Sequence, residues 1–96
     1  MAEGQGVYAI SVAAEMVSME IQNLRVYERR GLVEPDRTPG GTRLYSNDDV
    51  ERLHRIGELL AEGLNLAGIA RVLSLEAELA RLRLDRDRLR RRLAAE

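Results

Sequence analysis

Residues 18–45 constrain the fold of this chain more than any other stretch, because an apolar stripe at helical spacing is followed by a glycine-rich turn. Ser18 is predicted to cap a helix of about three turns, and Gly31 to end it in a left-handed conformation. With Leu24 facing the core, the opposite face of this helix carries Gln22, Arg25, Val26 and Arg29. Amide and guanidinium groups of this kind read base edges and hold phosphates.

A short basic hairpin is predicted directly after this helix. Arg37 stands before the turn Pro39–Gly41 and Arg43 stands after it, and the glycines of the turn tolerate positive φ. Upstream, Ser11 is predicted to cap a shorter helix, which Val17–Met19 would join to the helix of Ser18. Two helices followed by a basic hairpin indicate a winged helix-turn-helix, whose second helix enters the major groove of DNA.

Composition narrows the classes of function. Ninety-six residues make one small domain. Without phenylalanine or tryptophan, its core is built from aliphatic side chains and is thin, which favours burial of further apolar surface against a partner. The absence of cysteine excludes disulfides and thiolate metal sites, and a single histidine, His54, does not make a conventional zinc site. Neither a metal site nor a cofactor site is predicted.

The charge balance argues mildly against a nucleic-acid binder. The net charge is −1, with sixteen acids against fifteen basic residues. All of the basic residues are arginine, however, the side chain that grips phosphate and guanine with a planar fork. We therefore expect weak, strongly salt-dependent DNA binding by one copy of the chain.

The remaining elements complete the expected domain organisation. Residues 1–6 are predicted to be a flexible tail and residues 7–73 the DNA-binding domain. Within it, a third helix begins at the cap Ser46 and ends at Glu62–Gly63, and Asn65 caps a fourth. The predicted apolar stripe of the third helix consists of Val50, Leu53, Gly57 and Leu60. The N-terminal residues lack a leader pattern and no stretch matches a membrane span, so a cytoplasmic protein is expected.

From residue 72 onward the apolar repeat changes to seven residues, which is typical of a coiled coil. Residues 74–96 are predicted to form a dimerisation helix. Its seam comprises Val72, Leu75, Leu79, Leu82, Arg86, Leu89 and Leu93, with Arg86 as a charged interruption. Acids lie near its start and arginines near its end, so antiparallel pairing brings opposite charges together. The expected fold class is thus mainly α, a winged helix-turn-helix head followed by an antiparallel coiled coil.

The motifs resemble the MerR family of transcription regulators. The resemblance covers roughly residues 8–73 and rests on the helix-turn-helix, on the segment RVYERRGL from Arg25 to Leu32, and on the segment GGTRLYSNDDV from Gly40 to Val50. Within the family, the pattern is similar to the heat-shock repressor branch called HspR. This resemblance implies that Arg25, Tyr27, Arg43 and Tyr45 meet DNA.

The resemblance also implies partners and a regulatory role. It implies a homodimer that binds an inverted-repeat operator in double-stranded DNA and represses heat-shock chaperone and protease genes. In the HspR branch the Hsp70 chaperone DnaK serves as co-repressor. Together, the helix face, the hairpin and the resemblance nominate as DNA-binding residues Gln22, Arg25, Tyr27, Arg29, Arg37, Arg43 and Tyr45.

Two other classes of protein are compatible with parts of this sequence. An architectural, excisionase-like winged helix would bend DNA without regulating a promoter, but it has less need of a seven-residue repeat. A coiled-coil interaction module would use its arginines only as solvated surface and would not bind DNA. An enzyme is the remotest class, since the sequence offers no paired carboxylates, nucleophile with base, or phosphate-binding glycine loop.

Overall fold

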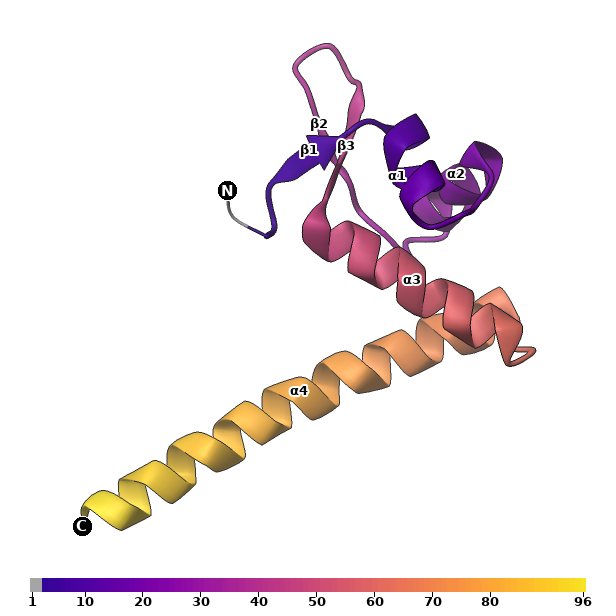
Figure 1. Cartoon of the computed structure of the whole chain (residues 1–96). Helices are drawn as coiled ribbons and strands as arrows, with labels where there is room; N and C mark the ends of the chain where they lie inside the picture. The colour runs from indigo at the N-terminus through magenta and orange to yellow at the C-terminus, as the bar shows by residue number, and fades with distance from the viewer. Residues whose placement is uncertain (1–2) are drawn as a thin grey trace. The chain divides into compact units, whose positions relative to one another are not determined.

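The computed structural model describes residues 3–96. In chain order it contains β1 (Gly6–Tyr8), α1 (Ile10–Met16), α2 (Ile21–Arg29), β2 (Asp36–Arg37), β3 (Arg43–Ser46), α3 (Asn47–Ala61) and α4 (Leu66–Ala95) (Figure 1). The chain divides into two compact units, one ending at Gly63 and the other beginning at Leu64. The mainly helical fold class with a small antiparallel wing and a long C-terminal helix is confirmed.

The turn between α1 and α2 differs from the prediction for Ser18. Ser18 adopts a φ of 54°, its amide donates to the carbonyl of Glu15, and the amide of Met19 donates to the carbonyl of Ala14. These bonds close α1 with the left-handed C-terminal motif usually made by glycine. The predicted N-cap at Ser18 is therefore wrong, because α2 begins three residues later, after Glu20.

The predicted cap at Ser11 is also wrong. Helix α1 begins at Ile10 after Ala9, and no side chain caps it. Ser11 therefore lies inside the first turn, where its hydroxyl is not the acceptor that begins the helix. Helices α1 and α2 pack together (Figure 1): Ala13 and Ala14 are buried on α1, and Leu24 and Tyr27 are buried on α2.

The end of α2 follows the prediction. Gly31 has a φ of 74°, its amide donates to Glu28, and the amide of Leu32 donates to Tyr27. This left-handed termination turns the chain so that Leu32 and Val33 enter the core. A glycine is favoured here because a Cβ strains the left-handed conformation.

The sheet has three strands in the order β1-β3-β2, whereas only the β2–β3 hairpin was predicted. Gly6 lies opposite Ser46 and Tyr8 opposite Tyr45, with an irregular register between them. The carbonyl of Glu3 also accepts a hydrogen bond from the amide of Asp48. The predicted tail of residues 1–6 is therefore wrong at its end: residues 1–2 lie outside the described residues, but Gly6 belongs to the sheet.

The hairpin turn has the geometry that its sequence predicts. Asp36 pairs with Leu44 and Arg37 with Arg43. Inside this ladder, the amide of Thr38 donates to the carbonyl of Thr42, and Gly41 reaches a φ of 87°. The projecting hairpin that consists of β2, β3 and the loop between them is the wing (Figure 1).

Helix α3 connects the sheet to the core. At its start, the Ser46 hydroxyl accepts from the amide of Asp49, and the Asp49 carboxylate accepts from the amide of Ser46, which confirms the predicted cap. The buried stripe consists of Val50, Leu53, Ile56 and Leu59. The predicted stripe was wrong at Leu60, which is 37% exposed, because buried positions recur here in steps of three and drift around the helix.

Helix α4 is a single element of 30 residues, so the predicted fourth helix and the predicted dimerisation helix are one. The Asn65 side chain accepts from the amide of Gly68, as predicted for the cap. The structural division falls between residues 63 and 64, ten residues before the predicted end of the DNA-binding domain. Among residues 3–96, no helix is long and apolar enough to span a membrane.

Candidate nucleic-acid interface

Helix α2 presents a polar face to solvent. Gln22, Arg25 and Arg29 are exposed, whereas Leu24 and Tyr27 on the opposite face are buried. Val26 lies between them and is half-buried. The two faces follow from the 3.6-residue period, because anchoring Leu24 and Tyr27 in the core turns these polar side chains outward. The exposed face therefore offers one amide and two guanidinium groups from a single helix.

The wing arginines lie opposite each other on β2 and β3 and meet the same carboxylate of α2. Arg37 Nη2 donates to Glu28 Oε2 at 2.9 Å, and Arg43 Nε donates to Glu28 Oε1 at 2.5 Å. Arg37 Nη1 also donates to the carbonyl of Gly41 at 2.9 Å. The contacts with Glu28 therefore connect the basic hairpin directly to the helix whose polar face lies in solvent.

Sequence reasoning did not nominate Glu28. A signal for it was available, since a hairpin that places Arg37 directly opposite Arg43 brings two like charges together. An acidic side chain near such a pair reduces the repulsion between the two guanidinium groups. The acid lies on α2, one position before the predicted DNA-binding residue Arg29.

Both tyrosines predicted to meet DNA lie in the core. Tyr27 is 5% exposed and Tyr45 is fully buried, and the Tyr45 hydroxyl has no hydrogen-bond partner within residues 3–96. Burial raises the pKa of both hydroxyls, and at Tyr45 the nearby Glu28 carboxylate raises it further. The hydroxyl of Tyr45 is thus not available to donate to a phosphate, because a core poor in aromatic residues uses this ring for packing.

The leucines of the predicted seam are exposed on α4. Leu75, Leu79, Leu82, Leu89 and Leu93 are between 46% and 70% exposed. Val72 is half-buried, and Arg86, the charged interruption, donates from Nη2 to Asp87 Oδ1 at 3.0 Å. Exposed apolar side chains that form a continuous stripe of this length are typical of a surface that packs against a partner.

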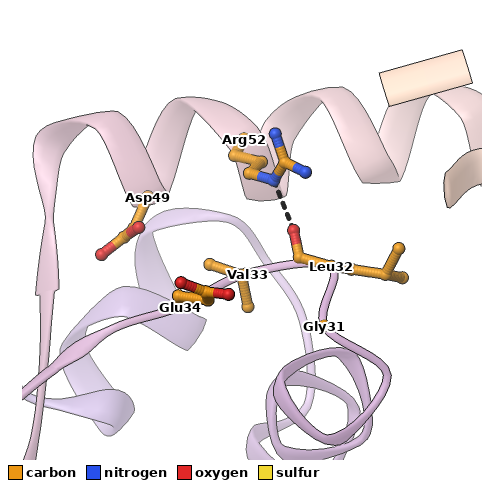
Figure 2. A pocket seen from close by; sticks show the side chains of 6 residues that line it. All are labelled: Gly31, Leu32, Val33, Glu34, Asp49 and Arg52. Atoms are coloured by element: carbon orange, nitrogen blue, oxygen red, sulfur yellow. Dashed lines mark hydrogen bonds between the residues drawn. The ribbon is translucent and has the colours of Figure 1, made fainter. Parts of the chain in front are cut away.

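A separate hollow of about 300 Å³ lies between the end of α2 and the start of α3 (Figure 2). It is lined by Gly31, Leu32, Val33, Glu34, Asp49 and Arg52. Arg52 Nε donates to the carbonyl of Leu32, and the Asp49 carboxylate belongs to the cap of α3, so both side chains hold backbone in place. Within residues 3–96, no three histidine, cysteine or acidic side chains gather as a metal site.

Together, a helix-turn-helix with a polar second helix, an adjoining basic wing and a long final helix define a winged helix-turn-helix protein. Residues 8–76 match the family described as MerR HTH family regulatory protein. The chain belongs to this family, as its sequence motifs predicted.

Curated relatives share this unit at substantial identity. The heat shock protein HspR of Streptomyces coelicolor is 48% identical over 83 residues, which cover 85% of this chain and 55% of the relative. The HTH-type transcriptional regulator GlnR of Bacillus anthracis is 41% identical over 66 residues, which cover 69% of this chain and 51% of GlnR. The chain thus spans about half the length of the curated relatives it matches.

One similar protein of known structure was solved in complex with DNA. HiNmlR, described as a MerR family regulator lacking the sensor domain and bound to promoter DNA, aligns with a TM-score of 0.63 and 25% identity. The alignment covers 90% of this chain and 77% of HiNmlR. It extends across both the winged helix-turn-helix and most of the long helix.

Proposed function

We propose that this chain is a sequence-specific DNA-binding regulator of transcription whose reading head consists of α2 and the wing. The observation that carries the proposal is the exposed face of Gln22, Arg25 and Arg29 beside the paired arginines of the wing. Arginine and amide side chains on a helix suit the major groove, and arginines on a hairpin suit the phosphates. The likeness to HiNmlR, solved with promoter DNA, supports the same use of this fold here.

The proposed active form is a homodimer. The exposed leucine stripe of α4 provides a second copy with an apolar surface in the a and d positions of a coiled coil. Antiparallel pairing would place the acidic residues Glu76 and Glu78 of one copy beside the arginines around Arg90 and Arg91 of the other copy. Two reading heads related by a two-fold axis would recognise an inverted repeat.

The proposed regulatory role is repression of heat-shock chaperone and protease genes. Its support is the 48% identity to the heat shock protein HspR of Streptomyces coelicolor over most of this chain. The chaperone DnaK is proposed as co-repressor on the same likeness. Addition of purified DnaK to the operator complex should tighten binding, and an unchanged affinity would remove DnaK from the scheme.

The function is tested by selecting bound sequences from a pool of random DNA duplexes with the full chain. Recovery of an inverted repeat is expected, with its half-sites about one helical turn apart. Recovery of A·T-rich DNA without symmetry would instead favour the architectural class. A pool that stays unenriched at low salt would overturn DNA binding and leave the coiled-coil interaction module.

A further inference from the structure

The carboxylate of Glu28 divides its two oxygens between the two arginines of the wing. Its side chain is only 17% exposed, while those of Arg37 and Arg43 are 47% and 26% exposed. Within residues 3–96, Arg43 uses only Nε for its hydrogen bond, and neither of its Nη atoms makes one. Glu28 is therefore the least exposed of the three side chains, and the two arginines that it contacts remain partly exposed.

This arrangement fixes the direction of both arginines. Like charges placed opposite each other on antiparallel strands repel, and the cross-strand pair Arg37–Arg43 is of this kind. A carboxylate between them offsets the repulsion and adds two charge-assisted hydrogen bonds. The local charge of the three groups stays positive, so the cluster still attracts phosphate.

We infer that Glu28 is a positioning residue that orients Arg37 and Arg43 for the DNA backbone and so sets how well the chain distinguishes its operator from other DNA. This inference rests on the proposed DNA-binding function. The physical reason is that oriented phosphate contacts fix the register of the helix against the bases. Ordering the two arginines before binding also lowers the entropy lost in the operator complex.

The inference opposes a simpler effect of the same charge. A carboxylate near DNA repels phosphate, so a purely electrostatic role for Glu28 predicts that its neutralisation tightens binding to every sequence alike. Binding to non-operator DNA depends on net charge and needs no fixed register. Operator binding depends both on net charge and on a fixed register of the helix against the bases. The ratio of the two affinities therefore separates positioning from simple repulsion.

The test compares Glu28→Gln, Glu28→Asp and the control Glu62→Gln in the full chain. Glu62 is exposed at the end of α3, and its variant makes the same charge change as Glu28→Gln. Affinities are measured over a salt series for the selected operator and for a scrambled duplex. We expect both Glu28 variants to lower the ratio of operator to scrambled affinity about tenfold, with Glu62→Gln close to the wild type. A similar rise in both affinities for Glu28→Gln would overturn the inference.

A second measurement needs no DNA. In the free protein, the Nε–H proton of Arg43 should show slow exchange with water in nuclear magnetic resonance spectra. It should lose this protection in Glu28→Gln at a temperature where that variant is still folded. Unprotected Arg43 in the wild type would contradict the positioning role. Protection without any operator binding by the wild-type chain would instead contradict the proposed function, so the two failures are distinguishable.

Discussion

The backbone amide of Gly6 donates to Asp36 Oδ2 at 3.0 Å, although their strands β1 and β2 lie on opposite sides of β3. The chain is close enough at this point that a Cβ on Gly6 would lie 2.5 Å from the carbonyl oxygen of Leu44 and 3.0 Å from the Cβ of Asp36. The first strand can therefore join the wing only because residue 6 has no side chain.

Gly6→Ala should consequently destabilise the winged unit. Because the nearest clash is with backbone, relief requires β1 to move away from β3, and we expect a loss of about 1–3 kcal/mol in the free energy of unfolding. Urea denaturation measures it. Gly40→Ala is the control, since a Cβ there would meet only the Thr38 hydroxyl at 3.8 Å. Equal stability of the two variants would mean that β1 does not hold this register.

Tyr45→Phe tests whether the buried ring of Tyr45 serves core packing and not DNA binding. Removing a hydroxyl that is buried without a partner should raise the free energy of unfolding by about 1 kcal/mol, and DNA affinity should not change. Chemical denaturation and operator binding check the two halves. A loss of operator affinity at unchanged stability would restore the role in phosphate binding that the sequence suggested.

The burial of Tyr45 predicts that the stability of the fold depends on pH in the alkaline range. Burial, and then the Glu28 carboxylate, raise the pKa of Tyr45 in the folded chain above its ordinary value of about 10. Above that pH the unfolded chain releases the proton while the folded chain keeps it, so stability falls as pH rises from about 10 toward the folded pKa. Tyr45→Phe should show a shallower decline in melting temperature between about pH 9 and 11. An unchanged decline would rule out Tyr45 as its source.

Arg25→Ala and Arg43→Ala should weaken DNA binding in different ways. Arg25 projects from the exposed face of α2, and loss of a base-edge contact there should cost about 1–3 kcal/mol and relax one operator position. Arg43 lies in the wing, and its loss should weaken the operator and its single-base variants by a similar factor and reduce the salt dependence. Binding to a panel of single-base operator variants at fixed salt separates them. Uniform losses for Arg25→Ala would exclude base reading by this side chain.

Leu82 and Leu84 form a matched pair for testing the coiled coil. Both are at least half exposed on α4, at 50% and 58%, but they lie on nearly opposite faces because two helical steps turn the chain by about 200°. Leu82→Asp places a charge in the proposed seam and should weaken dimerisation at least about a hundredfold. Leu84→Asp should leave the dimer intact. Sedimentation equilibrium measures both, and a dimeric Leu82→Asp would contradict the assigned seam.

Local signals in the sequence predicted the parts of the fold that depend on near neighbours. The turn at Gly31, the capping box of Ser46 and Asp49, and the cap at Asn65 each involve residues within five positions of one another. Their physical chemistry is contained in a short segment, so a single sequence is enough to predict them.

Long-range partners explain what the sequence did not predict. Strand β1 pairs with β3, which lies about forty positions later in the chain, and nothing within Gly6–Tyr8 indicates that partner. Tyr45 looked like a surface residue because it follows Arg43 in a basic hairpin. Burial along β3 does not alternate but increases toward α3, so Tyr45 and the next residue, Ser46, are both buried. Glu28 was overlooked because its two partners come from strands that only the folded hairpin brings together.

Helix α4 can also be regarded as a ruler. Its 30 residues run without interruption for about 45 Å, at 1.5 Å per residue. In the proposed dimer, a slip of one heptad keeps leucine against leucine but shifts one copy along the other by about 10 Å, roughly the rise of three base pairs. The register of the seam and the spacing of the operator half-sites would then have to change together, and a promoter that gained or lost base pairs between half-sites would require a matching slip in the protein.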